Sequence, residues 1–179
     1  MFSVKNKNID LGILEDFMKM KVEACGFILN DEKGEPYIYL DNIGSEEDKD
    51  LLTPLSENRA SCTLSKYTEI IWHTHPYSYK AYPSMEDIIK ILKPRLYPKT
   101  SLIFTSWGIW ELYAGNKDLI SKDLNKAIQK ELDTLYFKTD KGRSVFNESV
   151  QGYIDDCIKN LERICKHYQL QIKFSRYSF

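Results

Sequence analysis

Two histidines and one aspartate lie close together in the sequence, in an arrangement that can bind a metal ion. His73 and His75 belong to the run HTHP (73–76), and Asp87 ends the run SMED (84–87). Residues two apart on a β-strand project from the same face, so both imidazoles can reach one ion. Two imidazoles, a carboxylate and a water molecule are the ligands of many catalytic zinc sites. We therefore expect one Zn²⁺ per chain, bound by these three side chains.

The run that contains Asp87 allows two other interpretations. With Ser84 as its N-cap, a helix would carry Asp87 in its first turn, close to the end of the histidine strand. The same serine and acid also fit a capping box, in which each satisfies a backbone N–H of the other, and no metal is then needed. A second register would use Glu86 as the ligand in place of Asp87.

Glu23 is the candidate general acid/base. It lies at the start of an expected strand, just before the run CGF (25–27). Hydrolysis by a water molecule requires a nearby carboxylate that takes the proton and returns it to the leaving amine. The alternative is an ordinary solvated glutamate.

Gly26 is a candidate for a close approach between two backbones.

Apolar spacing predicts the elements that must position these residues. We expect strands at 22–29, 36–40, 69–75, 101–105, 109–113 and 170–174, and helices at 11–20, at 84–92 and, as two amphipathic stripes, in the last third of the chain. The run TDKGR (139–143) indicates a break between these last two helices, and we expect residues 44–58 to form an acidic, mobile connection. The expected fold class is α/β, a mixed sheet with flanking helices. A core at 1–115 would carry a helical C-terminal extension at 116–179.

Net charge, hydropathy and cysteine content indicate which classes of protein the sequence does not favour. The chain has 179 residues and a formal net charge of −1, which gives no support for a nucleic-acid or anionic-membrane partner. The amino-terminal residues lack the apolar run of a signal peptide, and no stretch has transmembrane length, so we expect a cytoplasmic protein.

The four cysteines form no C-x-x-C pair, and we expect buried, reduced thiols. The two helical stripes predict core packing, with a homodimer or partner surface as the alternative.

The motifs together resemble the JAMM/MPN+ family of zinc metalloproteases. The order E-x-C-G-F (23–27), H-T-H-P (73–76) and P-S-x-x-D (83–87) is similar to the signature of that family, and the resemblance covers about residues 10–115. One difference is the loop 76–83, which has eight residues where the family usually has seven. This loop contains the tyrosine-rich run YSYKAY (77–82), which either contacts substrate or is an ordinary surface loop.

The resemblance implies a fold, a chemistry and a set of roles. The fold would be the cytidine-deaminase-like mixed sheet of JAMM/MPN proteins. His73, His75 and Asp87 would bind zinc, Glu23 would be the general acid/base, and Ser84 would stabilise the oxyanion. The activity would be hydrolysis of isopeptide or peptide bonds, with ubiquitin or a ubiquitin-like conjugate as substrate. The alternatives are a non-catalytic MPN scaffold and a bacterial or viral JAMM peptidase with a non-ubiquitin substrate.

Overall fold

The computed structural model of the protein describes residues 11–20, 22–44, 62, 69–76, 81–92, 100–114, 122–145 and 150–177. Over these residues the protein is an α/β structure, with four helices and a six-stranded mixed sheet. The strands are β1 (Ala24–Asn30), β2 (Pro36–Ile43), β3 (Ile70–Thr74), β4 (Thr100–Thr105), β5 (Gly108–Ala114) and β6 (Leu170–Ser175). The helices are α1 (Leu11–Lys19), α2 (Met85–Leu92), α3 (Lys122–Val145) and α4 (Val150–His167).

A single sheet joins the strands in the order β2-β1-β3-β4-β5-β6. Each neighbouring pair is antiparallel except β3 and β4, which are parallel. Parallel strands need a crossover connection, and α2 lies in the one between β3 and β4. This βαβ unit carries both halves of the candidate site, because the histidines lie at the carboxyl end of β3 and Asp87 lies in the first turn of α2.

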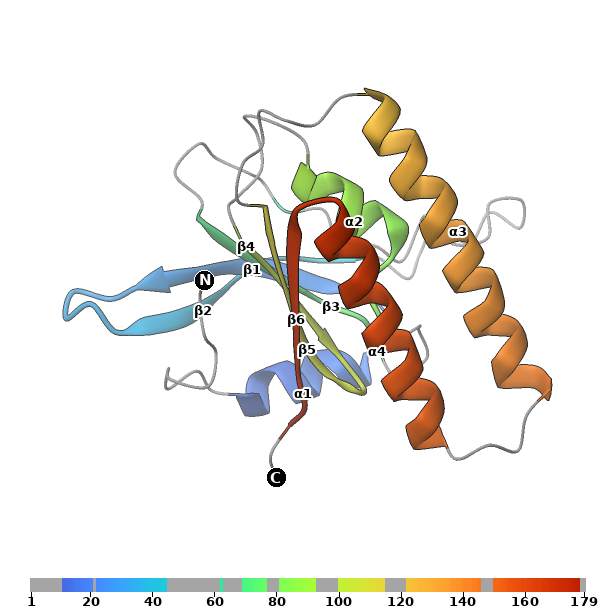
Figure 1. Cartoon of the computed structure of the whole chain (residues 1–179). Coiled ribbons are helices and arrows are strands. Elements are labelled where there is room, and N and C mark those ends of the chain that lie inside the picture. The colour runs from blue at the N-terminus through green and yellow to red at the C-terminus, as the bar shows by residue number, and fades with distance from the viewer. Residues whose placement is uncertain are drawn as a thin grey trace.

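Apolar side chains form a separate core on each face of the sheet. Helices α2, α3 and α4 cover one face and α1 covers the other (Figure 1). The central strand β4 serves both cores, since Ile103 enters the first and Leu102 and Phe104 enter the second. Ile128 of α3 and Leu161 of α4 are fully buried in the first core. The prediction that the helical stripes pack on the core is therefore confirmed, and the dimer surface stays a prediction.

The predicted elements are present, with shifted ends. The β1 strand begins at Ala24 rather than Val22, and β2 continues three residues past Leu40 to Ile43. Gly26 lies at an irregularity in the β1–β2 pairing, and a Cβ added there would lie 1.8 Å from the Tyr39 carbonyl oxygen. The predicted close backbone approach at this glycine is therefore confirmed.

The predicted helix break at 139–143 is wrong. The α3 helix runs without interruption to Val145, and α4 begins at Val150. The run TDKGR contains a glycine but no proline, and glycine in a helix costs only about 1 kcal/mol relative to alanine. The acidic connection predicted at 44–58 lies outside the described residues, except for Gly44. In the part of the chain that the structure describes, no helix has both the length and the apolar character needed to cross a membrane.

The expectation of four reduced thiols is also wrong for one pair. Cys25 and Cys62 form a disulfide across a sequence separation of 37 residues, with their Cα atoms 6.0 Å apart. Cys157 and Cys165 are buried thiols that take no part in a disulfide, as expected. The disulfide could not be predicted because the spacing of two cysteines in a sequence does not indicate whether the fold brings them together.

Candidate metal centre

The two histidines lie at the carboxyl end of β3, where that strand leaves the sheet. His73 is in β3, and His75 follows its last residue but still donates its backbone N–H to the Phe104 carbonyl at 2.8 Å. Thr74, between them, points to the other face and binds β1, since its Oγ1 accepts the Ala24 N–H at 2.9 Å. Both imidazoles therefore project on the face that α2 covers, as the strand alternation predicts.

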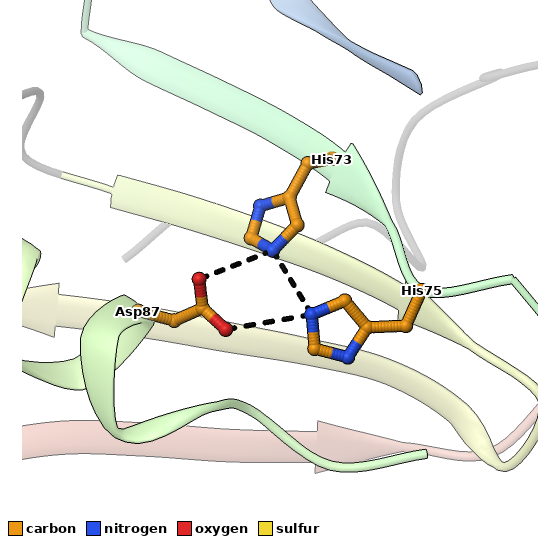
Figure 2. A group of neighbouring side chains, drawn as sticks. All are labelled: His73, His75 and Asp87. Carbon is orange, nitrogen blue, oxygen red and sulfur yellow. Dashed lines mark hydrogen bonds and ion pairs between the residues drawn. The ribbon is translucent and has the colours of Figure 1, made fainter. Parts of the chain in front are cut away.

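Asp87 faces both imidazoles from the first turn of α2. Figure 2 shows its carboxylate pointing toward the two rings. Its Oδ1 lies 3.3 Å from His73 Nε2 and its Oδ2 lies 3.4 Å from His75 Nε2, and the two Nε2 atoms are 3.3 Å apart. One donor atom from each of the three residues lies within 4.8 Å of the others, which is a group that could hold a metal ion.

The carboxylate is charged although it is largely enclosed. The side chains of His73, His75 and Asp87 are only 14%, 7% and 12% exposed, respectively. Burial alone would raise the pKa of the Asp87 carboxyl, but the adjacent imidazoles outweigh burial and hold this pKa well below its ordinary value. The site therefore presents an anionic oxygen donor beside two nitrogen donors, a combination that suits a divalent transition metal.

Ser84 fixes the direction of this carboxylate. Its backbone N–H and its Oγ both donate to Asp87 Oδ2 at 2.7 Å. In return, the Asp87 N–H donates to Ser84 Oγ at 3.2 Å. These reciprocal bonds form the capping box considered above as an alternative to metal binding. The same carboxylate also faces both histidines, so capping the helix and binding a metal do not exclude each other.

Glu23 lies near the site but outside the three-residue metal group. It is the residue before β1, it is buried, and its backbone carbonyl accepts the Gly44 N–H at 2.8 Å. In the β1–β3 pairing Cys25 lies opposite His73. The same register, continued by two residues beyond the paired strands, would bring Glu23 opposite His75 at this end of the sheet.

Two further sequence interpretations can be compared with the structure. The Glu86 side chain, proposed in the other register, is 48% exposed and pairs with Lys90 at 2.8 Å along the outer face of α2. The end of the tyrosine-rich run is not at the surface, because Tyr82 is buried in the first core. Residues 77–80 of that run lie outside the described residues.

The segment that leads into Ser84 is held by side chains that the sequence analysis did not identify. Trp110 Nε1, from β5, donates to the Ala81 carbonyl at 3.1 Å. The Tyr136 hydroxyl, from α3, donates to the Pro83 carbonyl. Both donors come from later elements of the chain, and no local sequence signal connects them to 81–83.

The disulfide lies beside the candidate ligands. Cys25 and His73 are directly opposite each other in the β1–β3 pairing, and residues in such a pair project from the same face. The bond from Cys25 therefore holds Cys62 on the face of the sheet that carries the histidines. A cystine in this position cannot supply a thiolate ligand, so the described metal group consists of nitrogen and oxygen donors.

Comparisons with known proteins do not assign this site to a family. No protein-family model matches the chain, and neither curated proteins nor solved structures give a match. Function must therefore be argued from the site itself.

Proposed function

We propose that the protein is a zinc-dependent hydrolase of the JAMM/MPN kind that cleaves isopeptide or peptide bonds. His73, His75 and Asp87 would hold one zinc ion. The observation that supports this most directly is the spacing of their donor atoms. Ligands at about 2.0–2.1 Å in tetrahedral geometry lie about 3.3–3.4 Å from one another. The two Nε2 atoms are 3.3 Å apart, and each lies 3.3 or 3.4 Å from a different oxygen of the Asp87 carboxylate, so either oxygen has two of the three separations that such a site requires.

Three protein ligands are the number found in catalytic rather than structural zinc sites. Structural sites have four protein ligands, whereas catalytic sites keep one position for water or substrate. The described group contains three. Zinc bound there would act as a Lewis acid, which acidifies water and polarises a carbonyl group.

The protein's own residues would then have separate tasks. Glu23, buried at the same end of the sheet, would take a proton from water and deliver it to the leaving amine. The Ser84 hydroxyl, which donates to Asp87 Oδ2, would turn toward the oxyanion as substrate reacts. The ubiquitin-like substrate class rests on the motif resemblance alone.

The zinc content of the purified protein tests the site first. We expect about one equivalent in the wild type and in Glu23→Gln, and none in His75→Ala. The matched control is His167→Ala, since His167 is an exposed histidine at the end of α4, and this variant should keep its zinc. A wild type that binds no zinc after reconstitution would support the scaffold alternative instead.

Hydrolysis assays then test the chemistry. Glu23→Gln should retain zinc but lose about 10²- to 10⁴-fold in rate, the usual contribution of general acid–base catalysis. The substrates would be a ubiquitin-like modifier joined to lysine through an isopeptide bond and unmodified peptides of similar sequence. Cleavage of peptides alone would favour the peptidase with a non-ubiquitin substrate.

A further inference from the structure

One peptide group near the site is held at both of its ends. The carbonyl of the Pro83–Ser84 peptide accepts a hydrogen bond from the Tyr136 hydroxyl. The N–H of the same peptide donates to Asp87 Oδ2 at 2.7 Å. A trans peptide is planar, with its C=O and N–H pointing in opposite directions. The hydroxyl that fixes the carbonyl therefore also fixes the N–H that is directed at the carboxylate.

The contact with Ser84 decides how the Asp87 carboxylate is turned. Asp87 Oδ2 accepts from both donors of Ser84 at 2.7 Å. This leaves Oδ1 facing His73 Nε2 at 3.3 Å. A rotation of the Pro83–Ser84 peptide would move both serine donors. The carboxylate would turn with them, and Asp87 Oδ1 would change its position relative to the His73 imidazole.

The position of the Tyr136 side chain is fixed by packing, so its hydroxyl can hold the Pro83 carbonyl in place. Its ring stacks on that of Tyr82, with the centroids 4.9 Å apart and the planes inclined by 19°. It packs against the first core, one turn of α3 after the fully buried Leu132. Burial raises the pKa of the Tyr136 hydroxyl well above its usual value, and the negative charge of Asp87 raises it further. The hydroxyl is therefore protonated at neutral pH and remains a donor.

From this geometry we propose that Tyr136 is a positioning residue for the metal-binding carboxylate of Asp87, acting through the Pro83–Ser84 peptide. The proposal rests on the metal site proposed above. It makes α3 part of the metal centre, although α3 supplies none of the candidate ligands. A hydrogen bond also polarises the peptide that accepts it, so the Ser84 N–H becomes a better donor to Asp87.

The test removes the hydroxyl and keeps the ring. Tyr136→Phe retains the stacking on Tyr82 and loses only the bond to Pro83. The matched control is Tyr168→Phe, because the Tyr168 hydroxyl also bonds within the helical part of the chain, to Glu131 Oε1 at 2.7 Å. Zinc affinity would be measured by competition with a chromophoric chelator. The visible absorption spectrum of the Co²⁺-substituted protein would report the ligand geometry, and urea unfolding would report stability.

We expect Tyr136→Phe to bind zinc about tenfold more weakly, the lower end of the 10- to 100-fold effect of groups that support metal ligands. Its Co²⁺ spectrum should shift, whereas Tyr168→Phe should match the wild type in affinity and spectrum. Unchanged affinity and spectrum in Tyr136→Phe, with any loss of stability, would overturn the inference and leave the zinc site in place. A wild type that binds neither Zn²⁺ nor Co²⁺ would overturn both proposals.

Discussion

Replacing Asp87 by asparagine separates the capping of α2, which its bonds with Ser84 show, from the metal binding that we propose for it. The amide keeps the shape of the carboxylate, and its oxygen can still accept from Ser84, but it carries no charge. In the native protein the carboxylate accepts two bonds at 2.7 Å. A hydrogen bond to a charged group contributes about 1.5–3 kcal/mol and a neutral one about 0.5–1.5 kcal/mol.

The expected effect on stability is therefore modest. Weakening two bonds by about 1 kcal/mol each lowers the free energy of unfolding of the metal-free protein by about 2 kcal/mol. The lower cost of burying a neutral amide reduces this loss, whereas losing the attraction of the two imidazoles, which outweighs burial in the native site, increases it. Urea denaturation in the presence of a chelator measures this difference directly.

The expected effect on metal binding is large. Removing a group that only supports a ligand costs 10- to 100-fold in affinity. Loss of the anionic ligand itself should exceed about 100-fold, or about 2.7 kcal/mol. Chelator competition measures this affinity, and Glu86→Gln is the control, since Glu86 lies next in the sequence but pairs outward with Lys90. If Asp87→Asn bound zinc like the wild type while losing stability, Asp87 would be a cap and nothing more.

Other features of the fold lead to three shorter predictions. Gly26→Ala should lower the free energy of unfolding in urea by more than about 3 kcal/mol, because the new Cβ would lie 1.8 Å from the Tyr39 carbonyl oxygen. Gly34→Ala is the control, since this glycine has a φ of 80° with open space around it, and the change should cost only about 1 kcal/mol. Cys62→Ser should cost about 3–4 kcal/mol, the loop entropy that a disulfide across 37 residues removes from the unfolded chain, and a smaller loss would indicate a compact unfolded state. Burial raises the pKa of Cys165 to about 12, so a thiol reagent at pH 8 should label it only after unfolding; rapid labelling of the native protein would contradict its burial.

The sequence predicted those parts of the structure that depend on local pattern. The apolar run from Ile70 to Trp72 identified β3, and the spacing of Ser84 and Asp87 identified the start of α2, because both signals arise from neighbouring residues. The α/β class follows from the order of such elements. The relation of Asp87 to the histidines required an assumption about how the loop 76–83 turns.

Contacts between distant segments could not be predicted in this way. Tyr136 lies 53 residues from the carbonyl that it binds, and Cys62 pairs with a cysteine of another element. Neither pairing leaves a trace in local composition. The cytoplasmic location stays a prediction. The disulfide counts against it, since such bonds persist mainly in oxidising compartments.

The three candidate ligands all lie between residues 73 and 87, in one βα unit. Closing so short a loop costs little chain entropy, so the unfolded chain can also chelate the ion. Affinity of the unfolded chain for metal reduces the stabilisation that binding gives to the native state. Zinc should therefore raise the melting temperature less than its affinity for the native site suggests. The same locality means that a bound ion would link β3 to α2 while closing only a short stretch of chain.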